Sequence, residues 1–149
     1  MLKALKNLFE PEQAGARSAA SLERSQLQLA VAVLLHEARR ADYAVGEDES
    51  APAERALAEL FGLARDASAA LLEEGRARAQ QLSSFYAPVS VIKRAFSLEE
   101  RIRLVEHLWR VSFADGRLDP FEDHYVRKIA HLLHIPNTQN MLARNRARS

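Results

Sequence analysis

Residues 113–122 read FADGRLDPFE, and this stretch combines the end of one helix, a tight turn and the start of the next helix. Before the turn, apolar residues recur at helical spacing at Leu104, Leu108 and Val111, which predicts an amphipathic helix. Gly116 is expected to end that helix. The stretch therefore predicts a helical hairpin with three acidic residues at its bend.

The acidic residues Asp115, Asp119 and Glu122 have two interpretations, as helix caps and as metal ligands. Asp119 is a good N-cap, and Pro120 suits the first helical position because the N–H that it lacks would have no partner there. Glu122 occupies the third helical position, from which a carboxylate reaches back to the cap. The same carboxylates are hard oxygen ligands of the kind that Ca²⁺, Mg²⁺ and Mn²⁺ prefer, although their spacing is not that of an EF-hand loop.

The first half of the chain repeats this pattern. When Asp42 is aligned with Asp115, the apolar residues that precede the two aspartates coincide, and Pro52-Ala53-Glu54 coincides with Pro120-Phe121-Glu122. Both halves contain an apolar stripe, Ala-Asp, a turn, Pro-x-Glu and a second apolar stripe. Two such hairpins packed by pseudo-symmetry predict an all-α core, with Asp42 and Glu54 as further candidate metal ligands.

Helical periodicity and capping signals extend through the rest of the chain. Ser97-Leu98-Glu99-Glu100 is a capping box, and residues 85–96 are expected to be helical because Pro88 disfavours a strand. We expect one compact all-α bundle of about seven helices, built around the two pseudo-repeated hairpins. Apart from the N-terminal segment, the expected helices are 21–41, 52–62, 66 or 68 to about 81, a short helix within 85–96, 97–114, 120–133 and a last short helix after 137.

The N-terminal 20 residues differ from the rest of the chain. Met1–Glu10 reads MLKALKNLFE and predicts a short, basic, amphipathic helix. Such a helix either anchors the chain at an anionic membrane surface, or packs on the body of the protein or frays. Pro11–Ala20 has no periodicity and predicts a linker. We therefore expect an N-terminal segment and linker at 1–20 and a helical domain at 21–149.

The composition excludes several classes of protein. The 149 residues are 48% hydrophobic and 28% charged, as in one globular domain. The formal net charge of +1 argues against nucleic acid as a partner. Without cysteine, the chain has no disulfide and no thiolate zinc site. The longest apolar run, Leu29–Leu35, is too short to span a membrane and no signal peptide is recognised, so we expect a cytoplasmic protein without a transmembrane segment.

No catalytic constellation is recognised in the sequence. It has no nucleophile elbow, phosphate loop or dinucleotide fingerprint, so we expect no enzyme and no catalytic or cofactor-binding residue. His36 and His107 lie inside the repeated helices and are expected to be core residues that donate to a carbonyl or carboxylate. His124, His131 and His134 lack the spacing of a zinc-binding pair on one helix and are expected at the surface.

The second hairpin, with the preceding Leu104–Trp109 and the following Arg127–Pro136, resembles the tellurite-resistance TerB family, a set that includes the N-terminal domain of the DjlA-type membrane co-chaperone. Its most specific element is Ala-Asp-Gly-x-Leu-Asp-x-x-Glu at residues 114–122, and the resemblance extends from Leu27 to Leu142. It implies a compact all-helical domain, not known as an enzyme, that is linked to stress response and proposed to bind metal ions or to work in membrane-associated complexes. Tyr43 stands where the family pattern has a glycine.

Two functional hypotheses follow. In the first, a stress-response domain binds a divalent cation through the acidic turns, and the cation rigidifies the two bends and so alters a partner-binding face. In the second, the acids are caps, and the domain is a metal-independent interaction module of a membrane-associated or co-chaperone complex. Both expect a protein partner, which lies at the inner membrane face if the N-terminal segment is an anchor. The ligands of the first hypothesis are Asp115, Asp119 and Glu122, with Asp42 and Glu54.

Overall fold

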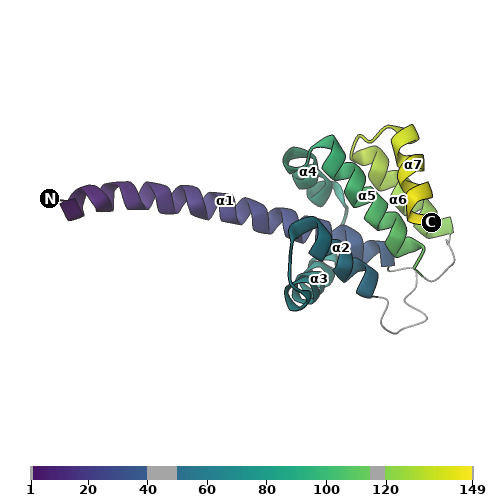
Figure 1. Ribbon diagram of the computed structural model, residues 1–149, viewed down its shortest axis with the longest axis horizontal. Coiled ribbons are helices and arrows are strands. Elements are labelled where there is room, and N and C mark those ends of the chain that lie inside the picture. Colours follow the sequence, from purple (N-terminus) through teal and green to yellow (C-terminus); the bar gives the residue numbers. More distant parts are fainter. Residues whose placement is uncertain (1, 40–49, 115–119, 149) are drawn as a thin grey trace.

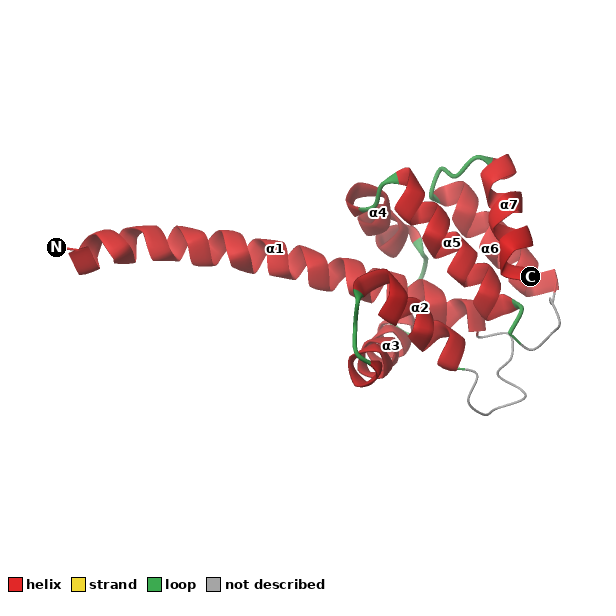
Figure 2. Cartoon of the chain, viewed as in Figure 1, coloured by secondary structure: helices red, strands yellow, loops and turns green. Residues whose placement is uncertain are grey.

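The computed structural model describes residues 2–39, 50–114 and 120–148, with side chains from residue 19 onward, and these residues form seven α-helices and no strand (Figures 1 and 2). The all-α prediction is therefore confirmed, whereas the pseudo-symmetry of the two hairpins stays a prediction. The helices are α1 (Leu2–Arg39), α2 (Ala51–Phe61), α3 (Arg65–Ala79), α4 (Tyr86–Ala95), α5 (Leu98–Ser112), α6 (Pro120–Leu132) and α7 (Asn137–Arg148).

The C-terminal part of α1 is the centre of the bundle. Every residue from Ala30 to Ala38 is buried, so this part of the helix is covered on all sides. The covering helices are α2, α3, α4, α5 and α6, all of which contact α1. In Figure 1 the preceding part of α1 projects away from the bundle as a long rod, and Leu22 on it is 62% exposed.

The predicted linker at Pro11–Ala20 is wrong, because α1 is continuous from Leu2 to Arg39. Alanine, glutamate, glutamine and arginine dominate this stretch, and all four are strong helix formers. Gly15 and Pro11 oppose the helix, at about 1 and about 3 kcal/mol relative to alanine, but neither interrupts α1. Ser21, expected at the start of a helix, is therefore an interior residue, while the domain boundary after residue 20 stays a prediction.

A glycine allows α3 to lie unusually close to α1. A Cβ added to Gly75 would lie 2.7 Å from both the backbone carbon and the Cβ of Ala32, which is far inside van der Waals contact. Gly75 and Ala32 are both buried. The two backbones therefore approach at a distance that no side chain on α3 would permit at this point.

The second central helix is α5, which contacts α1, α2, α6 and α7. It starts at the predicted capping box: the Ser97 hydroxyl accepts from the Glu100 N–H at 3.2 Å, and the Glu100 carboxylate accepts from the Ser97 N–H at 2.8 Å. Its buried face includes Leu104, Leu108 and Val111, in agreement with the predicted stripe. The helix ends at Ser112, two residues earlier than expected.

A buried tyrosine ties α6 to α1. The Tyr125 hydroxyl donates to the backbone carbonyl of Leu34 at 2.8 Å. Burial raises the pKa of Tyr125 well above its ordinary value, and the negative charge of Glu37 adds to the effect. The phenol therefore keeps its proton and remains a donor across the neutral range.

Candidate functional site

Of the three acidic residues predicted at the bend of the second hairpin, the structure describes only Glu122. Asp115 and Asp119 lie outside the described residues. Glu122 lies in the first turn of α6, where it is the third residue of a helix that begins at Pro120 as predicted. Its side chain is almost completely buried, with 2% of the residue exposed, which the capping interpretation did not predict.

Of the acidic residues of the first hairpin, Asp42 also lies outside the described residues. Glu54 lies in the first turn of α2 and is half-buried, and its N–H donates to the Ser50 carbonyl at 2.9 Å. Ser50 precedes this helix without a side-chain cap hydrogen bond. Across residues 2–39, 50–114 and 120–148, no three histidine, aspartate or glutamate side chains gather into a group that would hold a metal ion.

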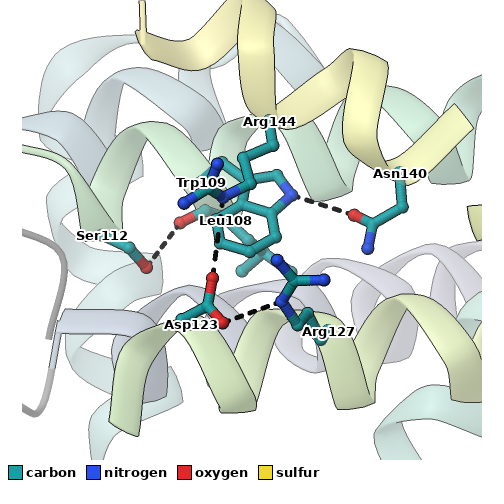
Figure 3. A network of polar contacts seen from close by, with 7 residues as sticks. All are labelled: Leu108, Trp109, Ser112, Asp123, Arg127, Asn140 and Arg144. Carbon is teal, nitrogen blue, oxygen red and sulfur yellow. Dashed lines mark hydrogen bonds and ion pairs between the residues drawn. The ribbon is translucent and has the colours of Figure 1, made fainter. Parts of the chain in front are cut away.

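A polar and aromatic network lies where α5, α6 and α7 meet (Figure 3). The Trp109 indole N–H donates to the Asn140 side-chain oxygen at 2.9 Å, and both residues are buried. The Trp109 and Phe113 rings stack with centroids 6.1 Å apart. The Arg144 guanidinium lies over both rings, 5.4 Å from the Trp109 centroid and 5.6 Å from that of Phe113.

Asp123 connects this network to α6. One carboxylate oxygen accepts from Nε of Arg127 at 2.8 Å, and the other lies 3.6 Å from Nε of Arg144 (Figure 3). The second contact is too long for a hydrogen bond, so Asp123 and Arg144 attract each other through charge alone. Nearby, Arg146 forms an ion pair with Glu106 of α5.

The partners of these arginines are not apparent from the sequence. The signal for the network was Trp109, the one tryptophan in the chain, because a buried indole N–H requires an acceptor. The acceptor is on α7, 31 positions further along, and nothing in local spacing identifies it.

A small pocket lies between α2 and α5, near the ends of both acidic turns. It has a volume of about 200 Å³, and Arg55, Glu59, His107 and Arg110 are among the residues that line it. His107 is buried, and its Nε2 lies 3.2 Å from a carboxylate oxygen of Glu59, which agrees with the predicted histidine–carboxylate contact.

Burial lowers the pKa of the His107 imidazole below its ordinary value. Glu59 opposes this shift, Arg110 adds to it, and Glu106 opposes it more weakly. At neutral pH the ring is therefore uncharged, and its contact with Glu59 is a hydrogen bond between a neutral donor and a carboxylate rather than an ion pair. His36 is also buried, whereas His124, His131 and His134 are exposed, as predicted.

Comparison with known families gives one match. A family profile described as "Tellurite resistance protein TerB" matches residues 28–145, which includes the buried part of α1 and nearly all of the helices after it. Neither the comparison with curated proteins nor the comparison with solved structures found a match. No helix within the described residues is long and apolar enough to cross a membrane.

Proposed function

The chain belongs to the TerB family, a tellurite-resistance family, and from that premise we propose that it is a non-enzymatic stress-response domain that binds a divalent cation at the α5–α6 bend. Its ligands are Asp115, Asp119 and Glu122, and Asp42 and Glu54 provide the corresponding acids at the α1–α2 bend. Ca²⁺, Mg²⁺ and Mn²⁺ are the candidate cations because carboxylate oxygens are their preferred ligands. The proposed location is the cytoplasm.

The burial of Glu122 is the observation that carries this proposal. A carboxylate that is 2% exposed loses its hydration, and it stays ionised only where positive charge or hydrogen-bond donors compensate. We propose a divalent cation as one source of such charge, in addition to the contact that Glu122 makes within the protein. Glu122 lies three positions after Asp119 and seven after Asp115, so the three carboxylates belong to one short segment.

The mechanism follows from the place of this bend in the bundle. Helices α5 and α6 both pack on α1, and α6 is linked to it by the Tyr125 hydrogen bond. A cation that links the bend to the first turn of α6 restricts how α6 moves against α5. Cation binding would then alter the surface that α5, α6 and α7 present to a protein partner.

The test is calorimetric titration of chelator-stripped protein with Ca²⁺, Mg²⁺, Mn²⁺ and Zn²⁺. We expect saturable binding of at least one of the first three ions, and a loss of at least ten-fold in affinity in Asp115→Asn and Glu122→Gln. Glu74→Gln is the matched control, because Glu74 is an exposed glutamate on α3. Absence of heat with all four ions, in protein with native helicity, would overturn the proposal.

A second candidate function is a metal-independent interaction module, and the projecting part of α1 favours it. Where α1 leaves the bundle, residues of α1, α3, α4 and the α3–α4 connection line a groove of about 240 Å³. Its wall on α1 includes Leu29 and Val33, and its opposite wall includes Leu82 and Val91. An apolar helix of a protein partner fits such a groove.

Membrane recruitment by the N-terminal segment is tested with the full chain. Co-sedimentation with anionic liposomes is compared between the natural sequence and a Leu5→Glu/Phe9→Glu variant, since an interfacial helix depends on its apolar side chains. We expect the variant to remain in the supernatant if the segment is an anchor. Equal pelleting of the two proteins would refute recruitment by this segment.

A further inference from the structure

A second groove, separate from both acidic bends, lies between the start of α4 and the second half of α6. Its volume is about 290 Å³, just below the range of about 300–1,000 Å³ for small-molecule sites. Its lining combines apolar residues, hydroxyl-bearing residues and two lysines. The lining residues are Ser83, Ser84, Phe85, Tyr86, Val89, Ser90, Lys93, Lys128 and Leu132.

Helical spacing explains why apolar and basic side chains meet in this groove. Val89 and Lys93 are one turn apart on α4, and Lys128 and Leu132 are one turn apart on α6, so each wall carries both kinds of side chain on one face. The Phe85 ring packs edge-on against Tyr125, with centroids 5.6 Å apart. Tyr125 is held by its hydrogen bond to α1, and this contact fixes the start of α4 relative to α6.

The charge of the groove is unbalanced. None of the described residues that line it is acidic, and neither Lys93 nor Lys128 forms an ion pair with a carboxylate of the described chain. Some basic side chains elsewhere are paired within a helix, as Arg76 is with Glu73 and Arg127 with Asp123, while others, such as the exposed Arg94, are not paired with any residue that the structure describes. Two lysines that share one groove without a carboxylate create a local positive potential that favours an anion.

We propose that this groove binds an amphiphilic anion, in which a carboxylate or phosphate is attached to a short apolar chain. The apolar chain lies against Phe85, Val89 and Leu132, where it is removed from water. The anionic group is bound by the ammonium groups of Lys93 and Lys128, with serine hydroxyls as further donors. This inference goes beyond the proposed function, because it uses none of the carboxylates of the acidic bends.

The test is titration of the full chain, followed by amide chemical shifts and by calorimetry, with octyl phosphate and octanoate below their micelle-forming concentrations. Octanol and inorganic phosphate provide the apolar chain and the anion separately. We expect each amphiphile to bind at least ten-fold more tightly than either fragment, with shift changes concentrated at Ser84, Val89 and Leu132. The ratio of the affinities for octanoate and octyl phosphate distinguishes a fatty-acid-like ligand from a phospholipid-like one.

Variants test the two halves of the recognition separately. Lys93→Gln/Lys128→Gln removes the charge, and we expect at least a ten-fold loss of affinity for the amphiphiles. Ser90→Phe keeps the charge and fills the groove, and we expect a similar loss. Arg94→Gln is the matched control, because Arg94 is an exposed cation next to Lys93 that does not line the groove, and its affinity should stay within two-fold.

Three outcomes would overturn the proposal. Octanol should bind more weakly than octanoate if the lysines contribute, so equal affinities would refute the charge contribution. An equal loss in Arg94→Gln and in the lysine variant would show a diffuse electrostatic effect without a site. Unchanged affinity in Ser90→Phe, with circular dichroism that confirms folding of every variant, would show that the ligand binds elsewhere.

Discussion

The α1–α3 and α5–α7 interfaces hold the bundle together in opposite ways. In the first, Gly75 contributes no side chain, and a Cβ at this position would lie 2.7 Å from both the backbone carbon and the Cβ of Ala32. In the second, the helices are separated by large groups, and Trp109 of α5 contacts Asn140 and Arg144 of α7 through an indole N–H and a ring face. The α1–α3 interface requires that Gly75 has no side chain, whereas the α5–α7 interface requires particular side-chain atoms at defined positions.

This difference teaches how each interface should respond to substitution. A backbone contact has no room to adjust, so the addition of one methyl group must move a helix. The residues of a polar and aromatic network can be substituted one at a time, and each substitution lowers the free energy of unfolding by its own amount. Substitutions at the two interfaces therefore allow the effect of steric exclusion on stability to be compared with that of directional bonding within one small domain.

The largest effect is expected for Trp109→Ala, which removes the biggest fully buried side chain. Deletion of such a side chain costs about 3–5 kcal/mol of the free energy of unfolding, through lost burial and a cavity. Urea denaturation followed by circular dichroism measures the loss. Trp109→Phe is the control, since it keeps a ring beneath Arg144, and it should cost clearly less. A loss below about 1 kcal/mol in the alanine variant would mean that α7 is not held by this side chain.

For the other interface, Gly75→Ala should destabilise by about 1–3 kcal/mol, the range for overpacked cores. The sign is informative, because alanine in a helix is otherwise favoured over glycine by about 1 kcal/mol. Ala77→Gly, at an exposed position of the same helix, measures that intrinsic preference. If Gly75→Ala were stabilising, the two backbones would not be in contact in solution.

Asn140→Ala tests the directional part of the α5–α7 interface. The substitution leaves the Trp109 indole N–H buried without its acceptor, which costs about 1–2 kcal/mol. In a Trp109→Phe background the donor is already absent, so the same substitution should cost much less. A double-mutant cycle from urea denaturation gives the coupling between the two residues. Equal costs in both backgrounds would contradict the hydrogen bond.

Charge is expected to contribute less at this interface. Arg144→Gln removes the cation over Trp109 and Phe113 and should cost about 0.5–1 kcal/mol. Arg146→Gln breaks a more exposed ion pair with Glu106 and should cost less than about 0.5 kcal/mol. The two variants are compared by thermal denaturation at low and high salt. A larger loss in Arg146→Gln would show that the rim contributes more than the ring contact.

The smallest effect concerns pH and the α2–α5 contact, which joins the two regions. Because the folded-state pKa of His107 is lowered, the unfolded chain binds more protons as the pH falls through about 6.5, and the folded state loses stability there. The contribution is complete above that pH. Urea midpoints measured from about pH 8 to about pH 5 should fall less steeply in His107→Gln than in the natural sequence. Parallel curves would show that His107 does not titrate differently on folding.

Local sequence signals were sufficient for most of the fold. The apolar spacing at Leu104, Leu108 and Val111 and the capping box at Ser97 depend on neighbours within one or two helical turns, and the structure confirms both. The exception was Pro11–Ala20, where a lack of apolar periodicity was interpreted as a linker. A helix that projects into solvent needs no apolar stripe, so its helix-forming composition was the better guide.

The candidate sites were less predictable, because they depend on contacts between distant segments. Glu122 was identified as a candidate ligand from its position after the turn, but its burial results from the packing of α6. The role of Gly75 depends on Ala32, and that of Arg144 depends on Trp109 and Asp123. Each pair is separated by more than twenty positions, beyond the range over which spacing identifies contacts.

The continuity of α1 also fixes an orientation. A flexible linker would allow the first residues to point anywhere, whereas a continuous helix sets both their distance and their angular direction relative to the bundle. At a rise of 1.5 Å per residue, residues 2–26 correspond to a rod of roughly 35–40 Å. One inserted residue in this rod would rotate everything before it by about 100°, while a seven-residue insertion would nearly restore the original direction. A partner of the N-terminal segment must therefore match both its distance from the bundle and its rotational orientation about the helix axis.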